Sequence, residues 1–427
     1  MLTVLFIGFF TMLVIGVPIA FAMAGSATLA LLLEGQVPLL LVVQRTYAGG
    51  DSFALMAIPF FIIAGEIMTA SRMTDRLVEL CNALLSHLRS GLAGVTVAAC
   101  VVFAGISGSG SADTAAIGSV LTPQLIAKGY PRGFAAAIVS TAGALGPIIP
   151  PSLLMIIYAA IAEQSVGQLF LAGILPGVMI GVGLMGVIHV WNTRRGWEAP
   201  SGERISPARV GRALQAALLP LGTPVVIVGG IVGGIFTATE AGVVAAVYAL
   251  LVAYFYSGIT WSALRQALIQ SGLLSSLSLF IISMAAVFGW ILARQDFPTT
   301  VADAVLSISD GNQLLGAALV IAMVLALGFF IEVLALMIIF VPILAPVGPA
   351  LGFDPIHWGL LMVMSMNVGG ITPPVGTNMF ISASIAKCSL VEISIYSIPM
   401  VAVHAIVVFL MLLMPDIALW IPRAVFG

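Results

Sequence analysis

Residues 146–152 read Gly-Pro-Ile-Ile-Pro-Pro-Ser, in the middle of an otherwise apolar stretch at 133–162. Proline removes a backbone donor and clashes with the preceding helical turn. Three prolines within five residues therefore predict a helix that is interrupted by an unwound segment. Such a break exposes carbonyl groups on one side, which suit a cation, and N–H groups on the other, which suit an anionic group. A simple proline kink is the alternative interpretation.

The same break recurs 223 residues further on, where residues 367–378 read Asn-Val-Gly-Gly-Ile-Thr-Pro-Pro-Val-Gly-Thr-Asn. With this spacing, Pro150 and Pro151 correspond to Pro373 and Pro374. The same spacing joins Gly35 to Gly258, Gly105 to Gly328, Pro123 to Pro346, Gly129 to Gly352, Gly146 to Gly369 and Pro176 to Pro399. Glycine is common in this chain, so isolated matches would mean little. The paired prolines in an ungapped register nevertheless predict an internal repeat.

The composition predicts a membrane protein. Of the 427 residues, 61% are hydrophobic and only 7% are charged, with a mean hydropathy of +1.19, whereas soluble domains carry about 25% charged residues. The net charge of −2 argues against a nucleic-acid partner, which would require a basic surface. The first thirty residues lack the basic start of a signal peptide, so 3–33 is interpreted as the first span.

A spanning helix needs about 20 apolar residues. Continuous spans are predicted at 3–33, 53–70, 169–191, 216–236, 239–257, 270–293 and 392–415. Three longer stretches, 92–127, 133–162 and 314–388, hold Gly, Pro and Ser clusters in their middles. We interpret 92–127 and 314–347 as re-entrant hairpins, and 133–162 and 357–387 as helices that cross once with a break.

Lysine and arginine indicate the orientation, because they concentrate on the cytoplasmic side. The hairpin interpretation places Arg45, Arg294 and Arg423 on one side. It places the other basic residues on the opposite side: Arg72, Arg76, Arg89, Lys128, Arg132, Arg194, Arg195, Arg204, Arg209, Arg212, Arg265 and Lys387. If the long interrupted stretches were ordinary spans instead, Lys128 and Arg132 would lie outside. The sequence thus predicts a cytoplasmic amino terminus and a periplasmic carboxyl terminus.

A polar connector at 192–212 divides the chain. We predict a first repeat at 1–191, a connector with the start of a linking helix at 192–223, and a second repeat at 224–427. An odd number of crossings separates equivalent elements, so the two repeats should have opposite topology. The predicted fold is an all-α polytopic membrane protein with two inverted-topology repeats, each with a re-entrant helical hairpin and a broken helix. This pattern is typical of secondary transporters.

The first hairpin tip, 103–114, reads Phe-Ala-Gly-Ile-Ser-Gly-Ser-Gly-Ser-Ala-Asp-Thr. Unpaired backbone in lipid costs several kcal/mol per group, so this tip must be buried in protein or line a wet cavity. Hydroxyl and carbonyl oxygens suit a small alkali cation. A small-residue face for helix packing is the alternative. Asp113 is a candidate for the site, although an N-cap role is also open.

The second hairpin tip, 328–333, is more apolar and keeps one acid, Glu332. Glu332 falls on Ser109 under the repeat spacing, so it is expected at a tip as well. Glu66, another acid inside an apolar segment, is interpreted as structural.

Four motifs carry a resemblance to a known family. They are Ala57-Ile-Pro-Phe-Phe-Ile-Ile-Ala-Gly-Glu-Ile-Met68, Ser107-Gly-Ser-Gly-Ser-Ala-Asp-Thr-Ala-Ala116, Gly146-Pro-Ile-Ile-Pro-Pro-Ser152 and Gly370-Ile-Thr-Pro-Pro-Val-Gly-Thr-Asn378. At these residues the chain resembles the large membrane subunit of tripartite ATP-independent periplasmic (TRAP) transporters, of the C4-dicarboxylate or sialic-acid type. The resemblance covers essentially the whole chain. It implies an elevator-type transporter of the bacterial inner membrane, driven by a sodium gradient and without other cofactors.

The resemblance also implies partners and sites. The partners would be a small membrane subunit of four helices, a periplasmic substrate-binding protein and the surrounding lipid. Sodium sites between hairpin tips and broken helices would map here to Ser107, Ser109, Gly146, Pro150, Gly328, Gly369, Thr372 and Gly376. Candidate contacts of the organic anion are Asp113, Thr114, Ser152 and Asn378.

Other classes of function fit less well. The sequence contains no HExxH motif, no GxSxG elbow and no GxxxxGK[ST] loop, which argues against a membrane enzyme and an ATP-driven pump. A passive channel does not need two inverted halves. The leading hypothesis is sodium-coupled import of a small organic anion, such as a dicarboxylate, sialic acid or another sugar acid. A free-standing ion-coupled carboxylate carrier is the alternative.

Overall fold

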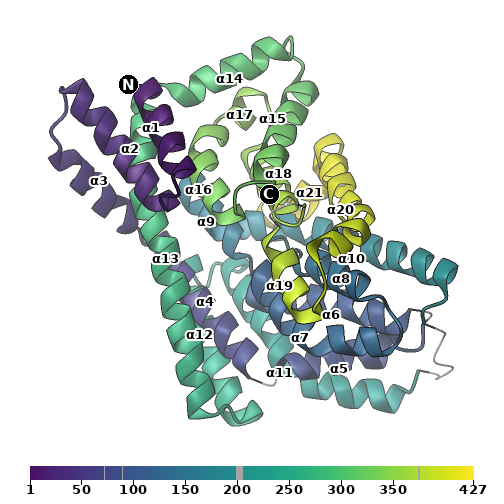
Figure 1. Ribbon diagram of the computed structural model, residues 1–427. Helices are drawn as coiled ribbons and strands as arrows, with labels where there is room; N and C mark the ends of the chain where they lie inside the picture. The colour runs from purple at the N-terminus through teal and green to yellow at the C-terminus, as the bar shows by residue number, and fades with distance from the viewer. Residues whose placement is uncertain (72, 89, 199–204, 374–375) are drawn as a thin grey trace.

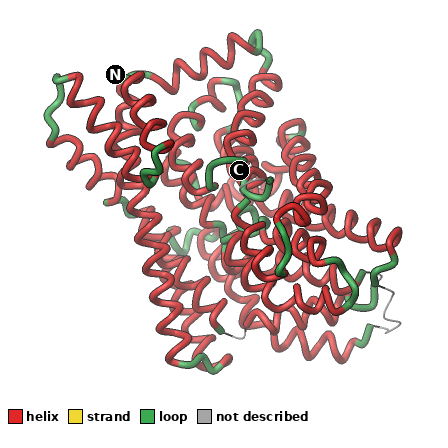
Figure 2. Tube along the Cα trace, viewed as in Figure 1, coloured by secondary structure: helices red, strands yellow, loops and turns green. Residues whose placement is uncertain are grey.

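The structure is a computed structural model that describes residues 1–427 except 72, 89, 199–204 and 374–375. Within these described residues every regular element is a helix, as Figure 2 shows. In the described part of the chain, six helices are long and apolar enough to cross a membrane, or up to eight if each of two bent helix pairs counts as one span. The predicted all-α membrane fold is therefore confirmed.

Helix α13 (Trp261–Arg294) is the longest element, and its 34 residues extend roughly 50 Å. It packs against α2 (Ile19–Glu34), α3 (Leu40–Gly50) and α4 (Ala57–Ala70), and α12 (Ala238–Val252) lies beside α4 (Figure 1). The crossing of α3 and α13 is very close, because a Cβ at Gly49 would lie 2.2 Å from that of Ala286. Glycine at this position lets the two backbones approach.

The first thirty-four residues form two helices, α1 (Leu2–Val14) and α2. Gly16 has a φ of +87° and Pro18 follows it, so the chain cannot continue as one helix. The two helices pack side by side in opposite directions, with Gly8 against Ser26 and Met12 against Gly25. The single span predicted at 3–33 is therefore wrong.

This hairpin also moves the amino terminus. The rings of Phe6 and Phe297 lie 5.1 Å apart, and Arg294 pairs with Glu34 at 3.1 Å. Both ends of the hairpin thus lie near the carboxyl end of α13, close to the N label in Figure 1. The amino terminus falls on the side of Arg294, opposite to the side expected from a single first span.

The interrupted stretches fold as pairs of helices. The first hairpin region holds α6 (Gly91–Ser107) and α7 (Gly110–Ala127), and the first broken helix holds α8 (Arg132–Gly143) and α9 (Leu153–Ala162). The second half holds α15 (Gln313–Gly328), α16 (Val333–Leu344), α18 (Pro355–Gly369) and α19 (Thr377–Ala386). Adding 223 to the first residue of α6, α7, α8 or α9 gives 314, 333, 355 or 376, within one residue of the corresponding start. The spacing of 223 residues found in the sequence therefore also separates equivalent helices of the two halves.

The longer spans connect these pairs. They are α10 (Val166–Arg195), α11 (Pro207–Val232) and α20 (Leu390–Leu413), and α12 continues as a π-helix, η2 (Ala253–Ser257). Shorter elements complete the described chain: η1 (Ala54–Met56), α5 (Met73–Leu85), α14 (Phe297–Ile308), α17 (Val347–Ala350) and α21 (Pro415–Phe426).

The connector after α10 is tied to the first hairpin by Glu198. Its carboxylate accepts a hydrogen bond from the Tyr130 hydroxyl at 2.8 Å and from the backbone N–H of Leu92 at 3.3 Å. Leu92 lies at the start of α6 and Tyr130 between α7 and α8. One carboxylate therefore holds the beginning of the hairpin and the beginning of the broken helix together.

We predict that the amino terminus and the end of α13 share one side of the membrane. In a chain whose three cysteines are replaced, new single cysteines at Thr3 and at Asp296 should react with a membrane-impermeant maleimide added to the same face. A cysteine at Arg265, at the other end of α13, should react only from the opposite face. Labelling of Thr3→Cys and Asp296→Cys from opposite faces would contradict the α1–α2 hairpin.

Candidate functional site

The two broken helices meet at the centre of the protein. Residues 133–143 of α8 and 356–369 of α18 are buried on every side. A helix that is buried all round lies in the interior of a protein or a bundle. The breaks that follow α8 and α18 therefore lie deep in the molecule, away from lipid.

The first hairpin tip closes directly on the first break. Gly108 lies between α6 and α7 with a φ of +62°, and its carbonyl oxygen accepts a hydrogen bond from Leu153 N–H at 3.1 Å. A Cβ at Gly108 would lie 2.4 Å from the Pro151 carbonyl oxygen. Only glycine satisfies both the left-handed backbone and this close approach. The Pro150–Pro151 peptide bond is cis.

Asp113 lies in the first turn of α7, fully buried. Its Oδ1 atom accepts a hydrogen bond from the Ser107 hydroxyl, whose oxygen in turn accepts one from Ser109 N–H at 3.1 Å. Its Oδ2 atom is buried and has no protein partner. Since Ser109 is the N-cap of α7, Asp113 is not the N-cap residue.

Gly146 borders the free carboxylate oxygen. A Cβ at Gly146 would lie 2.7 Å from Oδ2 of Asp113 and 2.8 Å from the backbone carbon of Ser109. The structure thus brings four predicted site residues, Ser107, Ser109, Asp113 and Gly146, into one cluster. The carbonyl oxygen of Pro150 lies nearby against α6, where it is 3.5 Å from the Cβ position of Gly105.

A second group of polar side chains gathers at the start of α7. The Thr114 hydroxyl donates to Gly110 O at 2.8 Å and faces Gly143. The Asn378 side-chain nitrogen lies 3.1 Å from the Cβ position of Gly110 and donates to Ser140 O at 3.4 Å. Asp113, Thr114 and Asn378 therefore share one region, to which the two halves of the chain both contribute.

Ser152 has a different environment. Its hydroxyl donates to Pro147 O at 2.6 Å and accepts from Met155 N–H at 3.2 Å as the N-cap of α9. These bonds hold the two sides of the break in place.

The second tip and the second break meet through two glycines. A Cβ at Gly369 would lie 2.6 Å from Cα of Gly328, and a Cβ at Gly328 would lie 2.7 Å from Cα of Gly369. The Thr372 hydroxyl donates to Val368 O at 2.6 Å, and Gly376 packs against Gly370 and Ile371. Two residues of this break, 374–375, lie outside the described residues.

The two other acids that lie inside apolar segments, Glu332 and Glu66, have different environments. Glu332 is the N-cap of α16, where its Oε2 atom accepts hydrogen bonds from Leu334 N–H at 3.0 Å and Ala335 N–H at 3.2 Å. It lies at the second tip, as the repeat spacing indicated. Glu66 is half-buried in α4, beside Gly65, which packs against Ser107.

Two residues near the site had no role in the sequence analysis. The Asn367 side chain donates to Ala144 O at 2.7 Å. The repeat spacing relates these two residues to each other, since 144 plus 223 is 367. A contact between equivalent residues places them near the pseudo-twofold axis of the repeat. The Ser140 hydroxyl is buried without a partner, like Oδ2 of Asp113. Ser140 lies outside the Gly- and Pro-rich motifs, so its sequence carries no comparable signal.

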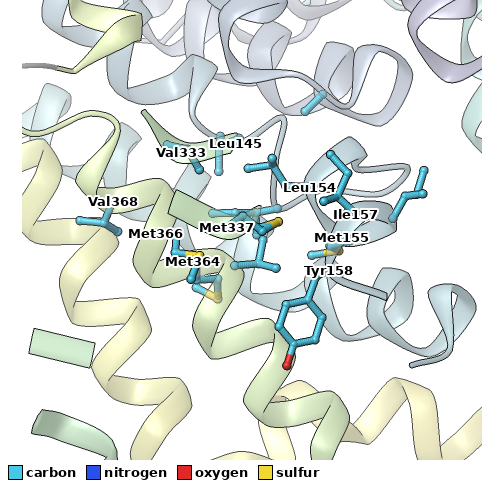
Figure 3. Close-up of a cluster of buried hydrophobic side chains, with 14 of the residues drawn as sticks. Leu145, Leu154, Met155, Ile157, Tyr158, Val333, Met337, Met364, Met366 and Val368 are labelled. Atoms are coloured by element: carbon cyan, nitrogen blue, oxygen red, sulfur yellow. The ribbon is translucent and has the colours of Figure 1, made fainter. Parts of the chain in front are cut away.

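Apolar side chains fill the space between the two breaks. Figure 3 shows side chains from both halves in one cluster: Leu145, Leu154, Met155, Ile157, Val333, Met337, Met364, Met366 and Val368. Such packing leaves little room for water between the two breaks and keeps the polar groups at the tips apart.

The arrangement is a fold of broken helices around buried oxygen atoms, as in membrane transporters. It is similar to the solved structure of the Alcanivorax borkumensis YdaH transporter, reported to have an unusual topology. The match has a TM-score of 0.61 over 90% of this chain and 87% of that one, at 14% identity. At that identity the likeness concerns the fold alone.

Residues 6–417 match the family described as the tripartite ATP-independent periplasmic transporter, DctM component, and the chain belongs to this family. It is 37% identical to the C4-dicarboxylate TRAP transporter large permease protein DctM of Pseudomonas aeruginosa, over 89% of this chain and 88% of that protein. It is 32% identical to the sialic acid large permease protein SiaM of Vibrio cholerae, over 98% of both.

A third relative is longer. The isethionate TRAP transporter permease protein DctMQ of Oleidesulfovibrio alaskensis is 36% identical over 98% of this chain, which spans 66% of that protein's length.

We predict that the Gly328–Gly369 contact tolerates no side chain. Gly369→Ala should destabilise the protein by about 1–3 kcal/mol, because the added methyl group overpacks a backbone crossing. Gly272→Ala is the matched control, since nothing lies within 4 Å of its Cβ position in α13. Thermal unfolding in detergent would measure both variants, and an unchanged melting temperature for Gly369→Ala would contradict the close crossing.

Proposed function

We propose that this chain is the transport subunit of a receptor-dependent tripartite transporter, which imports a small organic anion with sodium by an elevator mechanism. The observation that carries the proposal is the unpartnered Oδ2 atom of Asp113. A buried carboxylate oxygen is costly unless it is paired or binds an ion. In the described structure its neighbours are hydroxyl and backbone groups, and a cation is the partner that we propose for it.

Sodium fits the donors that surround this oxygen. Hard cations prefer carboxylate, hydroxyl and carbonyl oxygens. The cluster of Ser107, Ser109, Asp113 and Gly146 supplies all three types, and glycine at 146 leaves the space open that a side chain would fill. In the second half, the corresponding candidates are Gly328, Gly369, Thr372 and Gly376, which would bind through backbone carbonyls and the Thr372 hydroxyl.

An organic anion fits the neighbouring region around Asn378. Helices α7 and α19 both begin there, and helix amino termini carry partial positive charge. Asn378 and Thr114 add hydrogen-bonding groups beside these termini. The related permeases are named for isethionate, C4-dicarboxylate, sialic acid and 2,3-diketo-L-gulonate, which are all small organic anions, so we propose a substrate of this class.

The closeness of the two regions would couple the binding of sodium to the binding of the organic anion. Asp113 links the two regions, because it touches Ser107 on one side and lies one residue from Thr114 on the other. A cation next to Asp113 offsets a negative charge that would otherwise repel an anionic substrate. Each ligand should then raise the affinity for the other, as reciprocal linkage requires.

The elevator motion would occur between two parts of the protein. We propose that the hairpins and broken helices move together against the long α13 with α3, α4 and α12. The tips contact the breaks through backbone bonds such as that from Leu153 to Gly108, which supports their motion as one body. With basic residues in the cytoplasm, the amino terminus and the end of α13 would both be periplasmic.

We predict that uptake requires sodium and not ATP. Proteoliposomes that contain this chain, the small subunit and the receptor should accumulate the anion under an inward sodium gradient. Replacing sodium by potassium should lower uptake about tenfold or more. Undiminished uptake in potassium would defeat sodium coupling. Full activity of this chain alone, without the other two proteins, would favour a free-standing carboxylate carrier.

We also predict that Asp113→Asn lowers sodium-dependent uptake roughly tenfold or more, because the neutral amide binds a cation poorly and can donate a hydrogen bond to Ser107. The matched control is Ser119→Ala, an exposed position on the same helix. Melting temperature and expression must match the parent, so that a loss of stability is not read as a loss of function. A normal rate with normal sodium dependence would make Asp113 a structural residue.

A further inference from the structure

A cavity lies outside the candidate sodium and substrate regions. It has a volume of about 270 Å³ and lies where the end of α9 faces α16, α17 and the start of α18. Its walls are mostly apolar and include four prolines: Pro342, Pro346, Pro349 and Pro355. Glu163, an exposed residue, is the charged side chain that lines it in the described chain.

Glu163 is placed at a cost to the protein. It is the C-cap of α9, with a left-handed backbone at a φ of 53°, a conformation that favours glycine. Since Glu163 also faces the cavity, its carboxylate is a candidate to contact a ligand there.

The rest of the cavity suits a long cationic side chain. Tyr158 lines it and is itself almost fully buried, with its ring against Gly359, where a Cβ would lie 2.5 Å from Cε1. In Figure 3 the Tyr158 hydroxyl points away from the apolar cluster. The proline surfaces of the cavity accommodate the apolar stem of lysine or arginine. Asp354, which precedes Pro355, adds a second negative charge nearby.

The cavity opens on the side of the membrane that has few basic residues. Helix α10 begins three residues after Glu163 and, about 45 Å further along, ends at Arg194 and Arg195. Since basic residues concentrate in the cytoplasm, the Glu163 end of α10 is the periplasmic end. A soluble partner can reach this cavity only from the periplasm.

We propose that this cavity receives a lysine or arginine side chain of the periplasmic substrate-binding protein, with Glu163 as its counter-charge. The proposal rests on the proposed function, because it assumes a receptor-dependent complex. It assigns Glu163 to docking and not to transport of the ion or the anion.

The test uses the full complex and measures uptake against receptor concentration. Glu163→Lys should raise the half-saturating receptor concentration about tenfold or more while the maximal rate stays the same, because it removes and reverses the counter-charge. High salt should raise the half-saturating receptor concentration of the parent toward that of the variant, because it screens the attraction between the charges. Asp303→Lys, the same charge reversal on exposed α14, is the matched control and should leave the curve unchanged.

Further outcomes separate the alternatives. An unchanged receptor curve for Glu163→Lys, or an equal shift for Asp303→Lys, would overturn the proposal. A shifted sodium dependence in Glu163→Gln, with normal receptor dependence, would show an inorganic cation in the cavity instead. Glu163→Gly should raise the melting temperature, since it relieves the backbone strain, and still weaken receptor dependence. Failure of the proposed function itself would appear differently, as uptake by the parent complex that needs no receptor.

Discussion

The cost of an unpaired backbone group away from water governs this structure. Each break in a helix frees donors and acceptors at membrane depth, and something must satisfy them. The protein does so by placing a hairpin tip against each break. Leu153 N–H binds Gly108 O at the first junction, and Ser152 bridges Pro147 and Met155 across the break. The glycines at these junctions are required because backbone meets backbone, with no room for a Cβ.

Several buried side-chain atoms of the described residues lack a partner, and among them Oδ2 of Asp113 is the one that belongs to a carboxylate. Oδ2 of Asp113 is as buried as the groups around it, yet the protein offers it no donor. A buried carboxylate oxygen is costly to leave unpaired. The same constraint therefore underlies both the tight junctions and the proposal that a cation binds beside Asp113.

The sequence predicted the parts of the fold that depend on local chemistry. Proline and glycine clusters located the breaks and tips to within a few residues, because those residues act on their own backbone. The first span failed because hydropathy does not register a turn: Gly16 and Pro18 interrupt α1 and α2 inside one apolar run. Helices α5, α14 and α21 are too short for a rule based on about 20 apolar residues.

The site was predictable as a set of residues but not as a set of contacts. Ser107, Asp113 and Gly146 were identified from motifs, whereas the meeting of Asn378 with Gly110 depends on how the two halves pack. Ser140 carries no motif, and its free hydroxyl follows only from its burial. Long-range packing, which pattern and propensity do not encode, accounts for these omissions.

The bond from Asn367 to Ala144 has a consequence for the symmetry of the two halves. In a perfectly duplicated protein the two equivalent residues would be identical, and each would make the same contact with the other. Here one half supplies an amide side chain and the other only a carbonyl oxygen. The pair at the pseudo-twofold axis is therefore asymmetric. Interchanging the two residues would place an alanine where the amide donor is needed, so the two halves of the chain are not interchangeable at the point where they meet.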